Sequence, residues 1–275
     1  MLDDSCKTRF PIVLIHGVGF RDTRKPYYWG RIPRTLAQHG AQVFFGHQDS
    51  WGTAQSNAQM LAETVDRILD ETGVPKVNLI AHSKGGIDAR GLASAHGYGD
   101  KVASITTIAS PHHGSKTMDA LMRFPRSLFK LGAFAVDNWT RTIAGDKRPD
   151  FLAVCEGFTT QGMERFNQEN PDVPGVFYQS YAFVMPTPRS DLALWFANYV
   201  LNRVEGPNDG LVSVESACWG ENAHVLESQV RRGISHLDEI DFRRRAFPGV
   251  ARGERGMDIC DLYTGIAADL KARGL

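Results

Sequence analysis

The stretch Val77-Asn-Leu-Ile-Ala-His-Ser-Lys-Gly85 decides the fold. Its first part, residues 77–81, is a short run that is apolar except for Asn78 and is typical of a buried strand in a parallel sheet. Its second part resembles the G-x-S-x-G pattern of a nucleophile elbow, a sharp turn from a strand into a helix, with Ala81 in place of the first glycine. Small residues on both sides of Ser83 let strand and helix approach closely. The stretch therefore predicts a strand, a nucleophilic serine and a helix over residues 87–95, with a purely structural turn as the alternative.

Similar apolar runs lie on both sides of this stretch, at residues 11–15, 41–45, 102–108 and 176–182. A stripe of apolar residues with helical spacing extends from Ala58 to Leu69. Gly73 and Pro75 are expected to end this helix. Strands that alternate with helices require right-handed crossovers and therefore form a parallel sheet. We expect an α/β protein with a mostly parallel central sheet and helices on both faces. All 275 residues are expected to form one domain.

The segment from about residue 116 to 150 interrupts this alternation. One helical stripe consists of Phe124, Leu128, Leu131 and Ala135, and the apolar residues outside it are Phe129, Phe134, Val136 and Trp139. A helix that is apolar on more than one side needs a second surface to cover. A buried core helix and a helical lid over the active site both fit this pattern. The position after the 102–108 strand favours the lid.

The composition excludes several classes of protein. Hydrophobic residues make up 42% and charged residues 23%, which suits a packed core. The 31 Lys and Arg balance the 31 Asp and Glu, so a nucleic-acid partner is not expected. No apolar run approaches the length of about 18 residues that a spanning helix needs. We expect a monomer that acts on a small ester or lipid, with action at a lipid–water interface as one alternative.

The N-terminus is polar, and the apolar residues 10–15 are too few for the core of a signal peptide. As written, the protein is expected to be cytoplasmic, or secreted if an export signal was removed. The four cysteines, Cys6, Cys155, Cys218 and Cys260, are widely spaced without a CxxC pair. This spacing favours ordinary thiols over a zinc or redox site, with a disulfide as the alternative in a secreted protein.

A serine nucleophile needs a base, which follows it in the chain after an acid in this kind of fold. His96 lies near the helix that leaves the elbow, and His112 and His113 precede the acid candidates. Two histidines remain. His236 lies in a loop before a helix start, whereas His224 lies in a segment that reads as a strand. We therefore choose His236 as the base.

The acid is expected in the turn Gly206-Pro-Asn-Asp-Gly210, where a tight loop presents Asp209 between Ser83 and His236 in the chain. Asp and Asn also occur in turns merely because they favour turn geometry. Glu205 and Glu215 are therefore kept as alternative acids.

The charge that develops on the carbonyl oxygen requires preorganised donors. One is expected to be the backbone N–H of Lys84, at the start of a helix where the helix dipole also helps. The second is expected from the loop His16-Gly-Val-Gly-Phe20, with Val18 as the donor. We expect His16 itself to be structural.

Together these residues resemble the bacterial true lipases of the Pseudomonas and Burkholderia type, which are triacylglycerol lipases of the α/β-hydrolase superfamily. The matching stretches lie between residues 10 and 245: Val13-Leu-Ile-His-Gly17, Tyr28-Trp-Gly-Arg-Ile-Pro33, Gly40-Ala-Gln-Val43, Pro75–Ile80 with His82-Ser83, Ser110-Pro-His-His-Gly-Ser115, Arg165-Phe-Asn167, Asn208-Asp-Gly-Leu-Val212 and His236-Leu-Asp-Glu239. The resemblance implies a triad of Ser83, Asp209 and His236, with Val18 and Lys84 as oxyanion donors. It also implies the α/β-hydrolase fold with a mobile helical lid at about 116–150.

The same resemblance implies a structural Ca²⁺ near the histidine loop. Its aspartate ligands would be Asp238, two residues after His236, and Asp191, the nearest upstream match. Hard cations prefer such oxygen ligands. The alternative is that both aspartates are surface or capping acids.

The sequence departs from the family pattern in two places: Ala81 replaces a glycine, and the usual cysteine pair is missing, with Glu215 at one of its places. As a third departure, no secretion signal is expected. The expected reaction is hydrolysis of a carboxylic ester through an acyl-enzyme, without an organic cofactor. An acyltransferase or a polyester depolymerase would use the same triad. A catalytically silent binding protein is the alternative from a different class.

Overall fold

The computed structural model describes residues 3–22, 27–227, 232–244, 246 and 258–275. These residues form a six-stranded sheet in the order β2-β1-β3-β4-β5-β6, and every neighbouring pair is parallel. The strands are β1 (Ile12–Ile15), β2 (Val43–Phe45), β3 (Val77–His82), β4 (Val102–Ile108), β5 (Phe177–Phe183) and β6 (Ala223–Leu226). The prediction of a parallel α/β sheet is confirmed, and each of the five expected strands lies within two residues of its predicted bounds.

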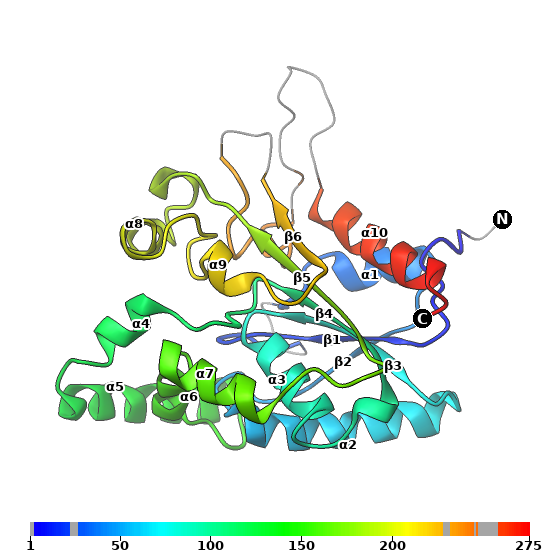
Figure 1. Cartoon of the computed structure of the whole chain (residues 1–275), viewed down its shortest axis with the longest axis horizontal. Helices are drawn as coiled ribbons and strands as arrows, with labels where there is room; N and C mark the ends of the chain where they lie inside the picture. Colours follow the sequence, from blue (N-terminus) through cyan, green and yellow to red (C-terminus); the bar gives the residue numbers. More distant parts are fainter. Residues whose placement is uncertain (1–2, 23–26, 228–231, 245, 247–257) are drawn as a thin grey trace.

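Helices cover both faces of the sheet (Figure 1). They are α1 (Ile32–Gln38), α2 (Ala54–Thr72), α3 (Lys84–Ala93), α4 (Lys116–Leu121), α5 (Arg126–Trp139), α6 (Phe151–Gly157), α7 (Thr160–Glu169), α8 (Trp195–Val204), α9 (Val214–Ala217) and α10 (Ile259–Ala272), with short helical turns η1 (Gly99–Lys101), η2 (Thr140–Ala144) and η3 (Pro188–Ser190). Among the described residues, no helix is both long and apolar enough to cross a membrane.

The alternation of side chains along β1 divides the core into two layers. Ile12 and Leu14 pack with α1 and α10 on one face, whereas Val13 and Ile15 pack with α2 and α3 on the other. All four side chains are buried. Burial of each aliphatic side chain contributes roughly 1.5–3 kcal/mol, so the continuous apolar run needs helices on both faces. With both faces covered, functional loops are expected at the carboxyl ends of the strands, where ligands bind in open α/β sheets.

The segment after β4 is folded differently from a core helix. It consists of α4, α5 and η2, and the first two are separated at Pro125, which precedes the first residue of α5. Phe134 is 71% exposed and Trp139 is 51% exposed. A buried core helix is therefore the wrong interpretation of this segment. The side chains of Leu128, Phe129 and Leu131 lie outside the described residues, and movement of the segment as a lid stays a prediction.

Candidate active site

Ser83 occupies a strained turn between β3 and α3. Its backbone has φ 55° and ψ −130°, and a positive φ is rare for a residue with a side chain. α3 begins at Lys84 rather than at Ile87, because the turn passes directly into the helix. A Cβ atom on Gly85 would lie 2.5 Å from the carbonyl oxygen of Ile15. The glycine thus permits the close approach of helix and strand that the elbow requires.

Asp209 and His236 lie together, as the sequence predicted for an acid and a base. Oδ2 of Asp209 lies 2.8 Å from Nδ1 of His236, and Oδ1 accepts hydrogen bonds from the backbone N–H groups of Leu211 and Val212. The carboxylate therefore favours the tautomer with a proton on Nδ1, which leaves Nε2 as the acceptor. The rings of His82 and His236 are 4.4 Å apart between centroids, so the His236 imidazole lies beside the elbow.

The alternative acids and bases lie elsewhere. Glu205 accepts hydrogen bonds from the Ser115 hydroxyl and the Thr117 backbone at the start of α4, and Glu215 is exposed. His224 lies on β6 and stacks on Tyr181. His112 is buried against Arg90. These four residues thus have other partners, whereas Asp209 and His236 are bonded to each other.

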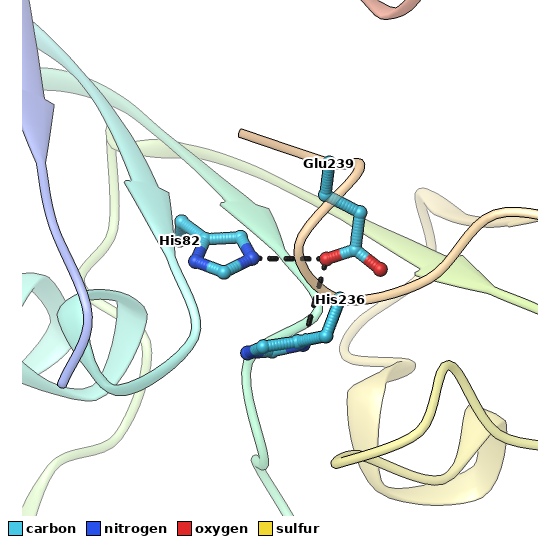
Figure 2. A group of neighbouring side chains, drawn as sticks. All are labelled: His82, His236 and Glu239. Carbon is cyan, nitrogen blue, oxygen red and sulfur yellow. Dashed lines mark hydrogen bonds and ion pairs between the residues drawn. The ribbon is translucent and has the colours of Figure 1, made fainter. Parts of the chain in front are cut away.

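Three further side chains, Tyr28, His82 and Glu239, join the active-site loops. Figure 2 shows two of them, His82 and Glu239, beside His236. Nε2 of His82 lies 2.9 Å from Oε2 of Glu239, and Nδ1 of His82 lies 2.7 Å from the Tyr28 hydroxyl. The same hydroxyl accepts a hydrogen bond from the backbone N–H of Gly17. Oε2 of Glu239 is also 3.6 Å from Nδ1 of His236. The chain of contacts connects the loop after β1, the elbow and the histidine loop.

Burial shifts the ionisation of this network. Desolvation, assisted by the carboxylate of Asp209, raises the pKa of Glu239 well above its ordinary value. Desolvation lowers the pKa of His82 well below its ordinary value. Both shifts favour the neutral form, so His82 and Glu239 join the loops through hydrogen bonds rather than through an ion pair. The sequence reasoning gave these two residues no role; their positions next to Ser83 and three after His236 were the available signals.

The loop after β1 contacts the elbow directly. A Cβ atom on Gly17 would lie 2.8 Å from Cβ of Ser83, so this glycine brings the loop against the serine. Val18 is half-buried at the next position. His16 is buried, and its ring contacts the backbone carbonyl oxygens of Gly17 and Gln48. These contacts give His16 a structural position below the loop, and the assignment of Val18 and Lys84 as oxyanion donors stays a prediction.

The side chain of Lys84 is buried in an ion pair within α3. Its Nζ atom lies 2.9 and 2.7 Å from the two carboxylate oxygens of Asp88, and Asn57 donates a further hydrogen bond to Oδ2 of Asp88. The network attaches the first turn of α3 to α2. It thereby fixes the backbone N–H that the oxyanion prediction assigns to Lys84.

Replacement of Lys84 by methionine is expected to lower the free energy of unfolding by about 3 kcal/mol, because the variant leaves a buried carboxylate with only its Asn57 partner. Urea unfolding followed by circular dichroism measures this loss. Lys101→Met is the matched control: Lys101 pairs with Asp66 at 2.6 Å, but both side chains are more than a third exposed. The control should lose less than about 1 kcal/mol. Equal losses in the two variants would contradict a structural role for the buried pair.

Asp191 and Asp238, the aspartates that the resemblance assigns to calcium, also lie together. The Ser235 hydroxyl is 2.7 Å from Oδ2 of Asp191 and 2.9 Å from Oδ2 of Asp238. Arg243, however, bridges the two carboxylates with its guanidinium group. The pair is therefore buried and internally bonded, rather than a set of surface or capping acids.

Comparison with known proteins agrees with this geometry. The family model described as alpha/beta hydrolase fold matches residues 11–201. A triacylglycerol lipase of Vibrio cholerae serotype O1 is 33% identical over 261 residues, which cover 86% of this chain and 80% of the relative. The chain belongs to the α/β-hydrolase family. A triacylglycerol lipase of Burkholderia plantarii is 30% identical, over 87% of this chain and 81% of that relative. A triacylglycerol lipase of Pseudomonas fragi is 28% identical over the full length of both chains. The resemblance to bacterial triacylglycerol lipases is thus confirmed, and the chain is a carboxylic ester hydrolase.

Solved structures share the fold of the hydrolase. The mature form of the Bacillus licheniformis lipase BlEst2 superimposes with a TM-score of 0.64 at 24% identity, covering 86% of this chain and 88% of that one. The metagenomic carboxyl esterase MGS0156 gives a TM-score of 0.70 at 14% identity, with coverage of 96% and 76%. At these identities the likeness describes the fold alone.

Proposed function

We propose that this hydrolase is a lipase that cleaves acylglycerols, with triacylglycerols as the principal substrate class, through a triad of Ser83, Asp209 and His236. The observation that carries the proposal is the hydrogen bond between Asp209 and Nδ1 of His236 beside the Ser83 elbow. This bond leaves Nε2 of His236 able to accept the proton of the serine hydroxyl. Relatives named triacylglycerol lipases support the choice of substrate.

The proposed reaction begins when the Ser83 oxygen attacks the ester carbonyl and its proton passes to Nε2 of His236. Asp209 orients the imidazole and stabilises the imidazolium. The backbone N–H groups of Val18 and Lys84 would bind the oxyanion, where preorganised donors lower the barrier most. His236 then protonates the leaving alcohol, and a water activated by the same histidine releases the carboxylic acid from Ser83.

Exposed apolar side chains on two helical segments support a lipid substrate rather than a small soluble ester. Leu192, Trp195 and Phe196, at and before the start of α8, are each more than half exposed, as are Phe134 and Trp139 on α5. Exposed apolar groups of this number on a protein surface commonly mark contact with a lipid or a partner. We therefore propose that the enzyme works at a lipid–water interface and that the 116–150 segment is its lid.

Hydrolysis of p-nitrophenyl esters from acetate to palmitate, with emulsified triolein alongside, tests this function. A lipase should prefer the longer acyl chains and release fatty acid from the emulsion. A fluorophosphonate probe should block both activities and label Ser83, as located by mass spectrometry of peptides. An enzyme that cleaves only acetate would be a short-chain esterase instead, and one that cleaves no ester, or carries the probe at another residue, would contradict the proposal.

A further inference from the structure

The two buried aspartates behind the histidine loop have no carboxylate oxygen without a protein partner. Oδ2 of Asp191 lies 2.5 Å from Nη2 of Arg243, and Oδ1 accepts a hydrogen bond from the backbone N–H of Ala193. Oδ1 of Asp238 lies 3.0 Å from Nη1 of Arg243. Oδ2 of Asp238 accepts a hydrogen bond from the backbone N–H of Ser235 and forms an ion pair with Nη1 of Arg232 at 2.7 Å. The residues present therefore do not fit a cation site of the kind the family resemblance implies, because its oxygens are already engaged.

Charge leads to the same result. The Asp191 and Asp238 side chains are 0% and 1% exposed, so their two negative charges need compensation inside the protein. Among the described side chains, Arg243 and Arg232 supply two positive charges in direct contact with them. A divalent cation would supply the same charge at the same place. Two guanidinium groups beside the carboxylates would repel it and compete for every ligand atom.

We infer that Arg243, assisted by Arg232, takes the structural place of the calcium ion, so that the hydrolase holds its histidine loop with a guanidinium clamp and needs no metal. The clamp is defined by Asp191, Asp238, Arg232 and Arg243. A guanidinium suits this position because its planar fork donates to two carboxylates at once, whereas a lysine provides only a point charge.

The clamp joins the C-terminal loop to a distant segment of the chain. Asp191 lies between η3 and α8, whereas Asp238 and Arg243 flank the turn that follows His236. The Ser235 hydroxyl, one residue before the histidine, contacts both aspartates. The clamp therefore holds the loop that carries His236 to the segment before α8.

Thermal unfolding tests the clamp without reference to catalysis, so its failure is distinguishable from failure of the proposed function. The wild-type melting temperature should be the same in excess EDTA and in excess calcium chloride, because a cation that bound only the folded state would raise it. Arg243→Gln should lower the melting temperature by about 5 °C or more in EDTA. Without the Arg243 guanidinium, the negative charges of the two buried carboxylates repel each other. Arg273→Gln, which removes an exposed pair with Asp269, is the matched control and should change it little.

The double variant Asp191→Asn/Arg243→Gln removes one charge of each sign and should regain most of the loss, because Asp238 keeps Arg232. It also provides a folded protein if Arg243→Gln alone does not fold. A wild-type enzyme that melts earlier in EDTA and is restored by calcium would overturn the inference. So would an Arg243→Gln variant as stable as Arg273→Gln, or a double variant less stable than the single one.

Discussion

Replacement of Ser83 by alanine is expected to lower kcat/KM for ester hydrolysis by about 10⁶-fold, close to the rate that binding and the oxyanion donors sustain without a nucleophile. The alanine removes the only atom that forms the acyl-enzyme in the proposed reaction. The Asp209–His236 hydrogen bond does not involve Ser83, so the rest of the site should persist. Hydrolysis of p-nitrophenyl butyrate measures the loss, and the thermal unfolding of the variant should match that of the wild type.

Ser94→Ala is the matched control for this experiment, because Ser94 lies at the opposite end of α3. It should retain wild-type kcat/KM. A Ser83→Ala variant that keeps more than about a tenth of the wild-type rate, while free of contaminating esterase, would remove Ser83 from the mechanism. The hydrolase would then need another nucleophile, and the proposed triad would fall with it.

Replacement of Gly85 by alanine is expected to reduce the free energy of unfolding by more than about 4 kcal/mol, an exceptional loss for one methyl group. The added Cβ would lie 2.5 Å from the carbonyl oxygen of Ile15 and 2.6 Å from that of His16. Both are backbone atoms of the strand and loop that support the elbow, so they cannot move aside as a flexible side chain could. Urea unfolding, or loss of soluble protein on expression, measures the effect.

Gly91→Ala tests whether this loss comes from the contact or merely from replacing a glycine in α3. The nearest atom to a Cβ at Gly91 would be a ring carbon of Phe166 at 3.7 Å, which is ordinary packing distance. Alanine also favours helix more than glycine does, by about 1 kcal/mol. Gly91→Ala should therefore be neutral or stabilising. If the two variants were equally stable, the close approach of α3 to β1 would not be what requires Gly85.

Local patterns in the sequence were sufficient for the sheet and the elbow. β1 and β3 are buried on both faces, so their apolar runs carry the signal of parallel strands without help from distant residues. The pairing of Asp209 with His236 followed from their order after Ser83 in the chain. The helix start was missed by three residues because the strained turn at Ser83 passes straight into α3.

Contacts between distant residues were beyond the reach of sequence patterns. Glu239 is a functional candidate only because folding places it 2.9 Å from His82, 157 positions earlier in the chain. Arg243 likewise looks like an ordinary surface arginine until Asp191 is brought against it. The family resemblance predicted a metal here because it identified Asp191 and Asp238 as ligands. It could not show that an arginine side chain bridges the two carboxylates.

The Tyr28–His82–Glu239 contacts also have a consequence for the order of folding. They require residues from three separate parts of the chain, so the loops they join cannot be arranged until the long-range contacts have formed. Such non-local contacts form late, because closing a long loop costs conformational entropy before the stabilising contacts have formed. Helices such as α2, by contrast, are local and can form early. During refolding from urea, the far-ultraviolet signal should therefore recover before ester hydrolysis does, and enzyme activity becomes a readout of the last stage of assembly.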